Sequence, residues 1–211
     1  RYVGSLGQAL AARGHEVSYL AGDPLRRRRS AKPGDVVDAD ARIFACPTSG
    51  WSAVRGRPPR QLLGWLSEHN PDIVHIANPA HIGCGPMMAA HWLRIPFVVT
   101  TMDFWWVCPK STLQRADGTI CDGSPGWQEC LRCCLRDHPG IFARAAGGLP
   151  APLSLISLAL LTARSIPRGG SPMEAVFWTE RRETTTGCLD LAAHVIYPSE
   201  ATRSAIAPHV S

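Results

Sequence analysis

The sequence predicts an α/β domain built on a parallel sheet, with helices on both faces of the sheet. Segments with helical spacing of apolar residues alternate along the chain with short segments typical of strands. With 45% hydrophobic and 18% charged residues in a chain of 211, a substantial core can form, which excludes a disordered chain. Fibrous classes are also excluded, because the sequence has no G-X-Y or heptad period. We therefore expect one large domain over residues 1–211.

The first predicted unit is a helix followed by a strand. Val3, Leu6 and Leu10 recur at helical spacing, and Gly14 stands where a helix commonly ends. The segments that follow are a strand, a turn, a polar loop rich in arginine, and a second short strand, at residues 15–20, 21–24, 24–40 and 41–46.

The middle of the chain continues the alternation. Residues 60–69 favour a helix that Asn70 and Pro71 end, because the residue before a proline avoids the helical conformation. The next segments are an apolar strand, a turn, a helix and another apolar strand, at residues 72–76, 78–79, 83–93 and 96–101. Continuous apolar strands of this kind are typical of a buried parallel sheet.

A last unit comprises a helix over residues 181–193, a strand over 194–197 and a helix that begins near Glu200, with Ser199 as its N-cap. In open α/β sheets, ligands bind outside the carboxyl ends of the strands. This rule predicts that Asn78, residues 101–104 and Ser199 border one crevice.

Between Phe104 and about residue 165 the alternation stops, and this insertion holds five of the eight cysteines. Cys108, Cys121, Cys130 and Cys133 follow the pattern C-x12-C-x8-C-x2-C, with Cys134 adjacent. A C-x2-C turn can present two sulfurs to one ion and two more thiolates can complete a tetrahedral shell, so we predict a structural zinc site at these four residues. An iron–sulfur cluster is an alternative with the same ligands, whereas disulfides need an oxidising compartment.

The net charge of 22 − 17 = +5 is mild and concentrated at residues 26–29, a run of four arginines. Between Cys108 and Cys134 three basic and three acidic residues cancel, which argues against a nucleic-acid partner. The sequence has neither a signal peptide nor an apolar segment long enough to span a bilayer, so we expect a soluble, cytoplasmic protein. Residues 26–29 with residues 153–164 are a candidate peripheral contact with the inner face of the membrane, with burial of 153–164 in the core as the favoured alternative.

Four short motifs occur in order: Arg-Gly-His-Glu-Val at 13–17, Pro-Asp-Ile-Val-His-Ile at 71–76, Asp-Phe-Trp at 103–105 with Cys-Pro at 108–109, and Ile-Tyr-Pro-Ser at 196–199. Together they resemble the amino-terminal, acceptor-side half of a family 4 glycosyltransferase. The resemblance is strongest to the subgroup in which the Asp-Phe-Trp segment leads into a Cys-Pro and a cysteine cluster. It covers nearly the whole chain.

The resemblance implies a GT-B enzyme of polysaccharide biosynthesis, in which two Rossmann-like domains face each other across a cleft. Such a hexosyltransferase moves a sugar from a nucleotide sugar to a glycan, lipid-linked or small-molecule acceptor without a catalytic metal. Relatives hold the donor through a carboxy-terminal domain with two glutamates seven residues apart, and neither that domain nor the first strand of the family fold is in this sequence. We therefore expect a chain truncated at both ends and inactive alone.

The resemblance also bears on the site. Many relatives have a histidine immediately before the aspartate of the Asp-Phe-Trp segment, where this sequence has Met102. Asp103 is the candidate catalytic residue, because a carboxylate at the end of a strand can accept a proton from an acceptor hydroxyl; it can equally only cap the following turn. Asn78, Met102, Phe104 and Ser199 are the candidate substrate-binding residues.

Other residues have plainer interpretations. We expect Trp105 and Trp106 to pack, His75 to be a satisfied core or cleft-edge histidine, and Cys46, Cys84 and Cys188 to be ordinary core residues. A second class of function stays open: a noncatalytic, zinc-ordered Rossmann-like module that binds a sugar or a protein partner.

Overall fold

The structure, a computed structural model, describes residues 2–22, 41–44, 60–77, 79, 83–137, 141–150, 152–153, 156 and 173–210. Several predictions concern residues outside these ranges. They are the substrate contact at Asn78, the basic run at residues 26–29, the core position of Cys46 and most of the segment 153–164.

Five parallel strands confirm the predicted sheet type. The strands are β1 (Tyr19–Gly22), β2 (Ala41–Phe44), β3 (Val74–Ile76), β4 (Phe97–Thr100) and β5 (His194–Ile196). β1 pairs with β2, and β4 lies between β3 and β5, every pair being parallel. The described strands thus form two sheets, with no ladder between β1 and β3.

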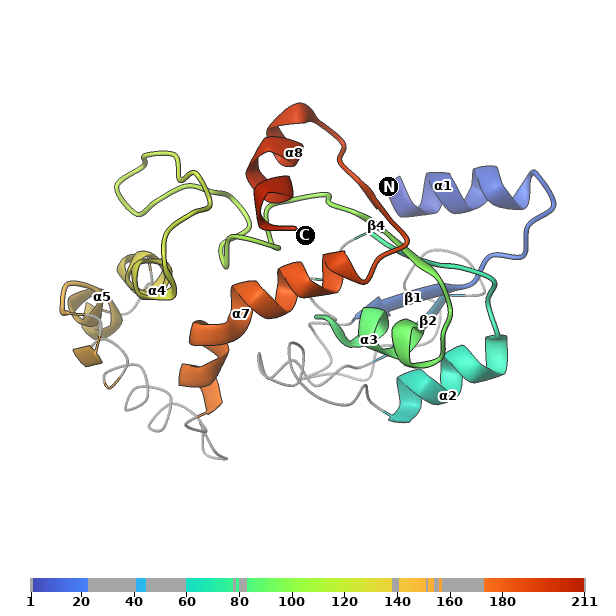
Figure 1. The fold of residues 1–211 in the computed structure, drawn as a ribbon, viewed down its shortest axis with the longest axis horizontal. Coiled ribbons are helices and arrows are strands. Elements are labelled where there is room, and N and C mark those ends of the chain that lie inside the picture. The colour runs from blue at the N-terminus through green and yellow to red at the C-terminus, as the bar shows by residue number, and fades with distance from the viewer. Residues whose placement is uncertain are drawn as a thin grey trace.

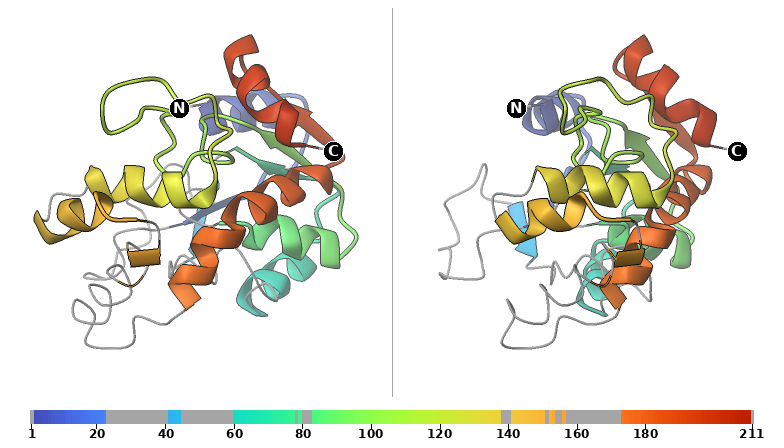
Figure 2. Two further views of the ribbon diagram at one scale, coloured as in Figure 1. Left: turned by 60° about the vertical axis from the view of Figure 1, so that its left-hand side comes forward. Right: turned by 90° about the vertical axis from the view of Figure 1, so that its left-hand side faces the viewer.

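Helices cover both sides of these strands. The five in the α/β part are α1 (Tyr2–Ala11), α2 (Arg60–His69), α3 (Gly85–Trp92), α7 (Met173–Asp190) and α8 (Glu200–Ile206). Helices α2, α3 and α7 lie on one side of the strands and α1 and α8 on the other (Figures 1 and 2). This arrangement is the α/β architecture that the alternating sequence pattern predicts.

Some boundaries differ from the predictions. The strand expected at 15–20 is β1 at Tyr19–Gly22, so the turn predicted at 21–24 begins two residues too early. The chain leaves α1 through Gly14 at φ 86°, and residues 15–18 run to the sheet without pairing. Strand β3 begins at Val74, and Ile73 before it is 55% exposed and not buried as its apolar run suggested. Helix α7 begins at Met173, well before the predicted start at residue 181.

The main core lies between β4, α3, α7 and the segment after β4. Phe97 and Val99 of β4 are buried there with Met87 of α3 and Leu189 of α7. Trp106 is fully buried and Trp105 is 9% exposed, which confirms that both tryptophans pack. The cysteines predicted in the core at positions 84 and 188 are also buried. A second cluster joins α2 to α3 through Leu62, Trp65, Leu66 and Ala89.

The described residues of the insertion form loops and helices. Helix α4 (Trp127–Arg136) packs against α5 (Ile141–Gly147) and against α7, at one end of the molecule (Figure 2). Leu131 and Leu135 are the buried face of α4. The loop before α4 turns at Gly118 and Gly123, which have φ angles of 84° and 82°. Glycine adopts this conformation without strain.

In the described part of the chain, no helix combines the length and the apolar character needed to cross a bilayer. Of the segment proposed to contact a membrane, Leu153 and Ile156 are described, and both side chains are about half exposed.

Candidate functional site

The carboxyl ends of β4 and β5 place two of the predicted site segments at one edge. Thr100 of β4 pairs with Ile196 of β5, so the residues that follow each strand leave the sheet side by side. The backbone N–H and the hydroxyl of Thr101 both donate to the carbonyl of Ile196, at 3.0 and 3.2 Å. These bonds hold the start of the 102–104 segment beside the chain that leads to Ser199.

Asp103 is half-buried in the turn that leaves β4. Its Oδ1 accepts a hydrogen bond of 2.8 Å from the backbone N–H of Trp105, so the predicted turn-capping contact is present. Within the described part of the chain Oδ2 has no hydrogen-bond partner. The carboxylate therefore has one oxygen engaged in the turn and a second oxygen free to accept a further donor.

The other described candidates differ in what they offer. Met102 is 43% exposed, and Phe104 is partly buried against the main core. Ser199 accepts from the backbone N–H of Thr202 at 3.2 Å, which confirms it as the N-cap of α8. Its hydroxyl also lies 2.7 Å from the hydroxyl of Thr202, so Ser199 is already engaged within the protein.

A polar group that the sequence analysis did not assemble is formed by residues of β3, β4 and α1. Nε2 of His75 on β3 is 2.7 Å from the hydroxyl oxygen of Thr100, and the hydroxyl of Tyr2 is 3.5 Å from that same oxygen. Burial lowers the pKa of His75. The expected satisfied histidine is therefore present, at a surface position and not in the core. The pairing of β3 with β4 and the position of α1 beside them bring these residues together, so sequence spacing could not reveal them.

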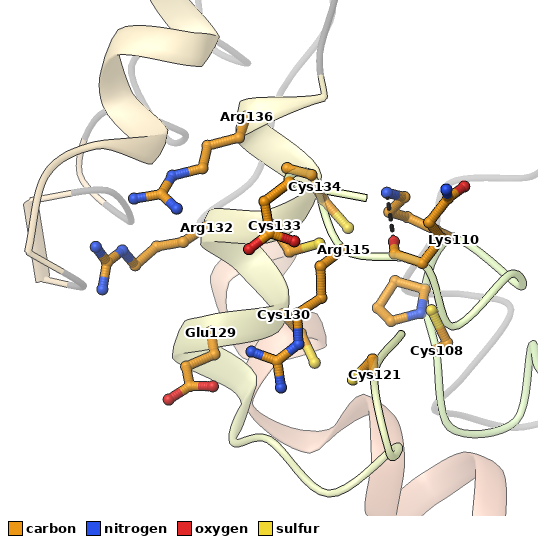
Figure 3. Close-up of a pocket in the computed structure, with 14 residues that line it drawn as sticks. Cys108, Lys110, Arg115, Cys121, Glu129, Cys130, Arg132, Cys133, Cys134 and Arg136 are labelled. Carbon is orange, nitrogen blue, oxygen red and sulfur yellow. Dashed lines mark hydrogen bonds between the residues drawn. The ribbon is translucent and has the colours of Figure 1, made fainter. Parts of the chain in front are cut away.

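The five cysteines of the insertion converge on one pocket of about 250 Å³. They come from the loop after Trp106, from the loop before α4 and from α4 itself (Figure 3). In the close-up, Cys121 and Cys130 lie beside each other, whereas the guanidinium groups of Arg132 and Arg136 point away from the thiols.

The local structure corrects one element of the zinc prediction. Cys130 and Cys133 do not form a turn, because both lie inside the regular helix α4. Among the residues that the structure describes, no group of three or more histidine, cysteine, aspartate and glutamate side chains is arranged to hold a metal ion. The zinc site predicted at Cys108, Cys121, Cys130 and Cys133 is therefore not supported by the structure as it stands.

The pKa of Cys134, which was not among the predicted zinc ligands, is strongly shifted in this pocket. Burial, and then the neighbouring Cys133, Cys108 and Cys130, raise the pKa of Cys134 to about 12. Burial also raises the pKa of Cys130, with Arg182 acting in the opposite direction. On a helix, residues 130 and 134 share a face as i and i+4 neighbours.

Two arginines of α7 border this group of thiols. Arg181 is 4% exposed, donates to the carbonyl of Trp105 and lies 5.0 Å over the Trp105 ring. Arg182 donates to the carbonyls of Ser124 and Pro125, and its Nη2 is 4.0 Å from Sγ of Cys130. Neither arginine forms an ion pair with a carboxylate in the described part of the chain.

Comparison with known proteins places this architecture in a family. Residues 1–121 match the glycosyl transferase 4-like domain, more than half of the chain. The chain belongs to this family. The match includes the turn at Asp103 and two of the clustered cysteines, Cys108 and Cys121.

This family member is also similar to a GDP-mannose-dependent alpha-mannosyltransferase from Mycolicibacterium smegmatis, with 34% identity over 89 residues. The aligned region is 40% of this chain and 23% of that relative, so the chain spans only a small part of the relative's length. No solved structure matches the chain significantly.

Proposed function

We propose that residues 1–211 form the acceptor-side domain of a glycosyltransferase of the GT-B type, with residues 104–165 as a cysteine-rich insertion. The observation that carries this proposal is that the family match extends through β4 to the turn at its carboxyl end, where Asp103 lies. The donor is a nucleotide sugar, and GDP-mannose is the first to test because the mannosyltransferase relative depends on it. The acceptor is a glycan, a lipid-linked sugar or a small molecule.

Asp103 is the proposed acceptor-activating base. Oδ1 is held by the Trp105 N–H, which fixes the orientation of the carboxylate, while Oδ2 can accept the hydrogen of an acceptor hydroxyl. A base positioned in this way typically accelerates proton transfer about 10²- to 10⁴-fold. Met102 and Phe104 flank this carboxylate, so we propose that they contact the acceptor. Ser199 contributes by capping α8 beside it.

The test compares Asp103→Asn with Asp103→Ala in the protein that also carries the donor-binding domain. Asparagine keeps an oxygen that can accept from Trp105 but cannot take a proton. We therefore expect Asp103→Asn to lose transfer from GDP-mannose by about 10²-fold or more while its melting temperature stays close to that of the parent protein.

Two outcomes would contradict parts of the proposal. Full transfer activity in Asp103→Asn, with activity lost only in Asp103→Ala, would show that Asp103 serves the turn alone. An absence of transfer with every nucleotide sugar, combined with saturable binding of a sugar, would favour the noncatalytic binding module.

A further inference from the structure

The polar group on β3, β4 and α1 has a defined place in the sheet. His75 of β3 pairs with Val98 of β4, and Thr100 comes two residues later in the same strand. Side chains alternate along a strand, so His75 and Thr100 project from the same face of the sheet as diagonal neighbours. Thr100 is 2% exposed, whereas His75 is exposed. A buried hydroxyl thus supports an imidazole that a ligand can reach.

Helix α1 adds an aromatic ring to this face. The ring of Tyr2 meets the imidazole of His75 edge to face, with centroids 6.4 Å apart and an interplanar angle of 87°. The hydroxyl of Tyr2 lies 3.5 Å from the hydroxyl oxygen of Thr100, so Tyr2 stands beside the same buried threonine. Tyr2 is nevertheless 40% exposed. An exposed tyrosine and an exposed histidine held side by side offer a ligand two apolar rings with polar atoms at their edges.

Thr100 orients the imidazole and leaves one of its nitrogens available. Nε2 of His75 is 2.7 Å from the Thr100 hydroxyl oxygen, while Nδ1 has no hydrogen-bond partner among the described residues. Burial lowers the pKa of His75, so the ring is uncharged at neutral pH and has one donor and one acceptor nitrogen. A sugar hydroxyl both donates and accepts, so it satisfies Nδ1 in either tautomer. A neutral imidazole gives a phosphate group no opposite charge, which favours an uncharged ligand.

The group lies at the same edge of the sheet as the proposed base. Thr100 is the last residue of β4, and Asp103 follows it by three residues. The two hydrogen bonds from Thr101 to the carbonyl of Ile196 hold the end of β4 to β5. A ligand bound at His75 therefore occupies the same carboxyl edge as the Asp103 carboxylate.

We propose that Tyr2 and His75 form a subsite for one uncharged sugar ring of the acceptor, with Thr100 as the positioning residue that orients the imidazole. The C–H face of the sugar packs on the tyrosine ring, and a hydroxyl of the sugar bonds to Nδ1 of His75. This inference rests on the proposed function, since the presence of Asp103 at this edge is what identifies the sugar as the acceptor. It narrows the acceptor to a molecule that carries a neutral sugar.

Binding of uncharged methyl glycosides tests the subsite independently of transfer. The probes are the methyl glycosides of glucose, galactose, mannose and N-acetylglucosamine, and the protein is the one that also carries the donor-binding domain. We expect at least one glycoside to bind saturably in ligand-observed NMR, without displacement by inorganic phosphate. In Asp103→Asn protein, which should not consume the probe, GDP-mannose should also leave the glycoside bound.

Substitutions separate contact with the sugar from support of the fold. His75→Gln keeps an amide that can reach Thr100 but has no group at the position of Nδ1. It should weaken glycoside binding about 3- to 10-fold with little change in melting temperature. Tyr2→Ala should weaken binding by a similar factor, whereas Tyr2→Phe, which keeps the ring, should retain most of it. His91→Gln is the matched control, because His91 is exposed on α3, on the other side of the strands from α1 (Figures 1 and 2).

Three results would overturn the subsite. They are the absence of saturable binding by every glycoside, displacement of the glycoside by phosphate or by GDP-mannose, and unchanged binding in His75→Gln. Displacement by GDP-mannose would assign the position to the donor sugar. If His75→Gln does not fold, the two Tyr2 variants still decide, because full binding in Tyr2→Ala would exclude the ring contact. Full transfer activity in Asp103→Asn would instead overturn the proposed base and leave the subsite in place, since glycoside binding needs no proton transfer.

Discussion

At the scale of single residues, Thr185 joins α7 to the segment that carries the tryptophans. Its buried hydroxyl lies 2.6 Å from the carbonyl of Trp106 and also near the carbonyls of Arg181 and Arg182, at 2.9 and 3.0 Å. Valine has a similar shape but no hydroxyl, so the Trp106 carbonyl would lose this donor. We expect Thr185→Val to lower the free energy of unfolding by about 1–3 kcal/mol, measured by urea denaturation.

Thr184 provides the matched control for that substitution. Among the described residues, its hydroxyl bonds to the carbonyl of Glu180 alone, one turn earlier on the same helix, at 3.0 Å. Thr184→Val should change the free energy of unfolding by less than about 0.5 kcal/mol. Equal effects of the two substitutions would show that the bond to Trp106 contributes nothing beyond local helix effects.

Ser199 gives a second prediction at this scale. Its side chain satisfies the backbone N–H of Thr202 in the first turn of α8. Ser199→Ala should therefore lower the free energy of unfolding by about 1 kcal/mol, while Ser199→Asn, which can also cap, should retain most of it. If alanine and asparagine destabilise equally, the hydroxyl has a role other than capping.

Local signals are the ones that the sequence conveys well. The cap at Ser199 was predictable because its side chain and the Thr202 N–H that donates to it are three residues apart. The surroundings of Arg181 and Cys134 were not predictable, because both residues have neighbours on the loop after β4. Arg181 donates to the carbonyl of Trp105, and Cys134 interacts with Cys108. Helices α4 and α7 are far apart in sequence, so residue spacing does not reveal that Arg182 of α7 lies beside Cys130 of α4.

At the scale of elements, α5 approaches α4 closely at Gly147. A Cβ added at Gly147 would lie 2.9 Å from the backbone nitrogen of Arg136 and 3.1 Å from the carbonyl of Arg132. Backbone atoms cannot move aside as a flexible side chain can, so Gly147→Ala should separate the two helices. We expect a loss of about 1–3 kcal/mol in the free energy of unfolding, measured by thermal or urea denaturation.

Gly64 in α2 is the control for backbone effects. A Cβ there would meet nothing within 4 Å, and glycine inside a helix is unfavourable. Gly64→Ala should therefore raise the free energy of unfolding by up to about 1 kcal/mol. A stabilising effect at both positions would mean that the contact between α4 and α5 is looser than the structure has it.

The helices and strands of the α/β part were predictable because the spacing of their apolar residues is typical of each type of element. Helix α2 matches its predicted bounds, since Asn70 and Pro71 mark its end and Asn70 has a positive φ of 39°. Strand β1 was misplaced because residues 15–18 alternate like a strand but have no partner strand beside them. Pairing is a property of the tertiary structure, so an alternating pattern predicts a strand without fixing where it begins.

At the scale of the whole molecule, the described strands divide into two parallel sheets whose edges at β1 and β3 have no ladder between them. The family resemblance implies a further strand before α1. A strand in that place, followed by α1 and β1, would form a βαβ unit, in which a helix connects two parallel strands of one sheet. A form of the protein that carries such a strand before residue 1 should show slower hydrogen exchange at the outer amides of β1 and β3 than residues 1–211 alone. Unchanged exchange would contradict a joining strand.

The last prediction concerns the activity of the 211-residue chain by itself. Transfer requires the acceptor hydroxyl and the anomeric carbon to be held in line, and the departing diphosphate to be stabilised. Asp103, at the end of β4, is the proposed group on the acceptor side, but the described residues show no group assigned to the diphosphate. We therefore expect residues 1–211 to show no detectable transfer of labelled mannose from GDP-mannose to acceptors, and we expect transfer to be recovered when the donor-binding domain is joined to them.

The control mixes the two domains as separate proteins, which tests whether they must be covalently joined. Turnover by residues 1–211 alone would show that this one domain holds both substrates.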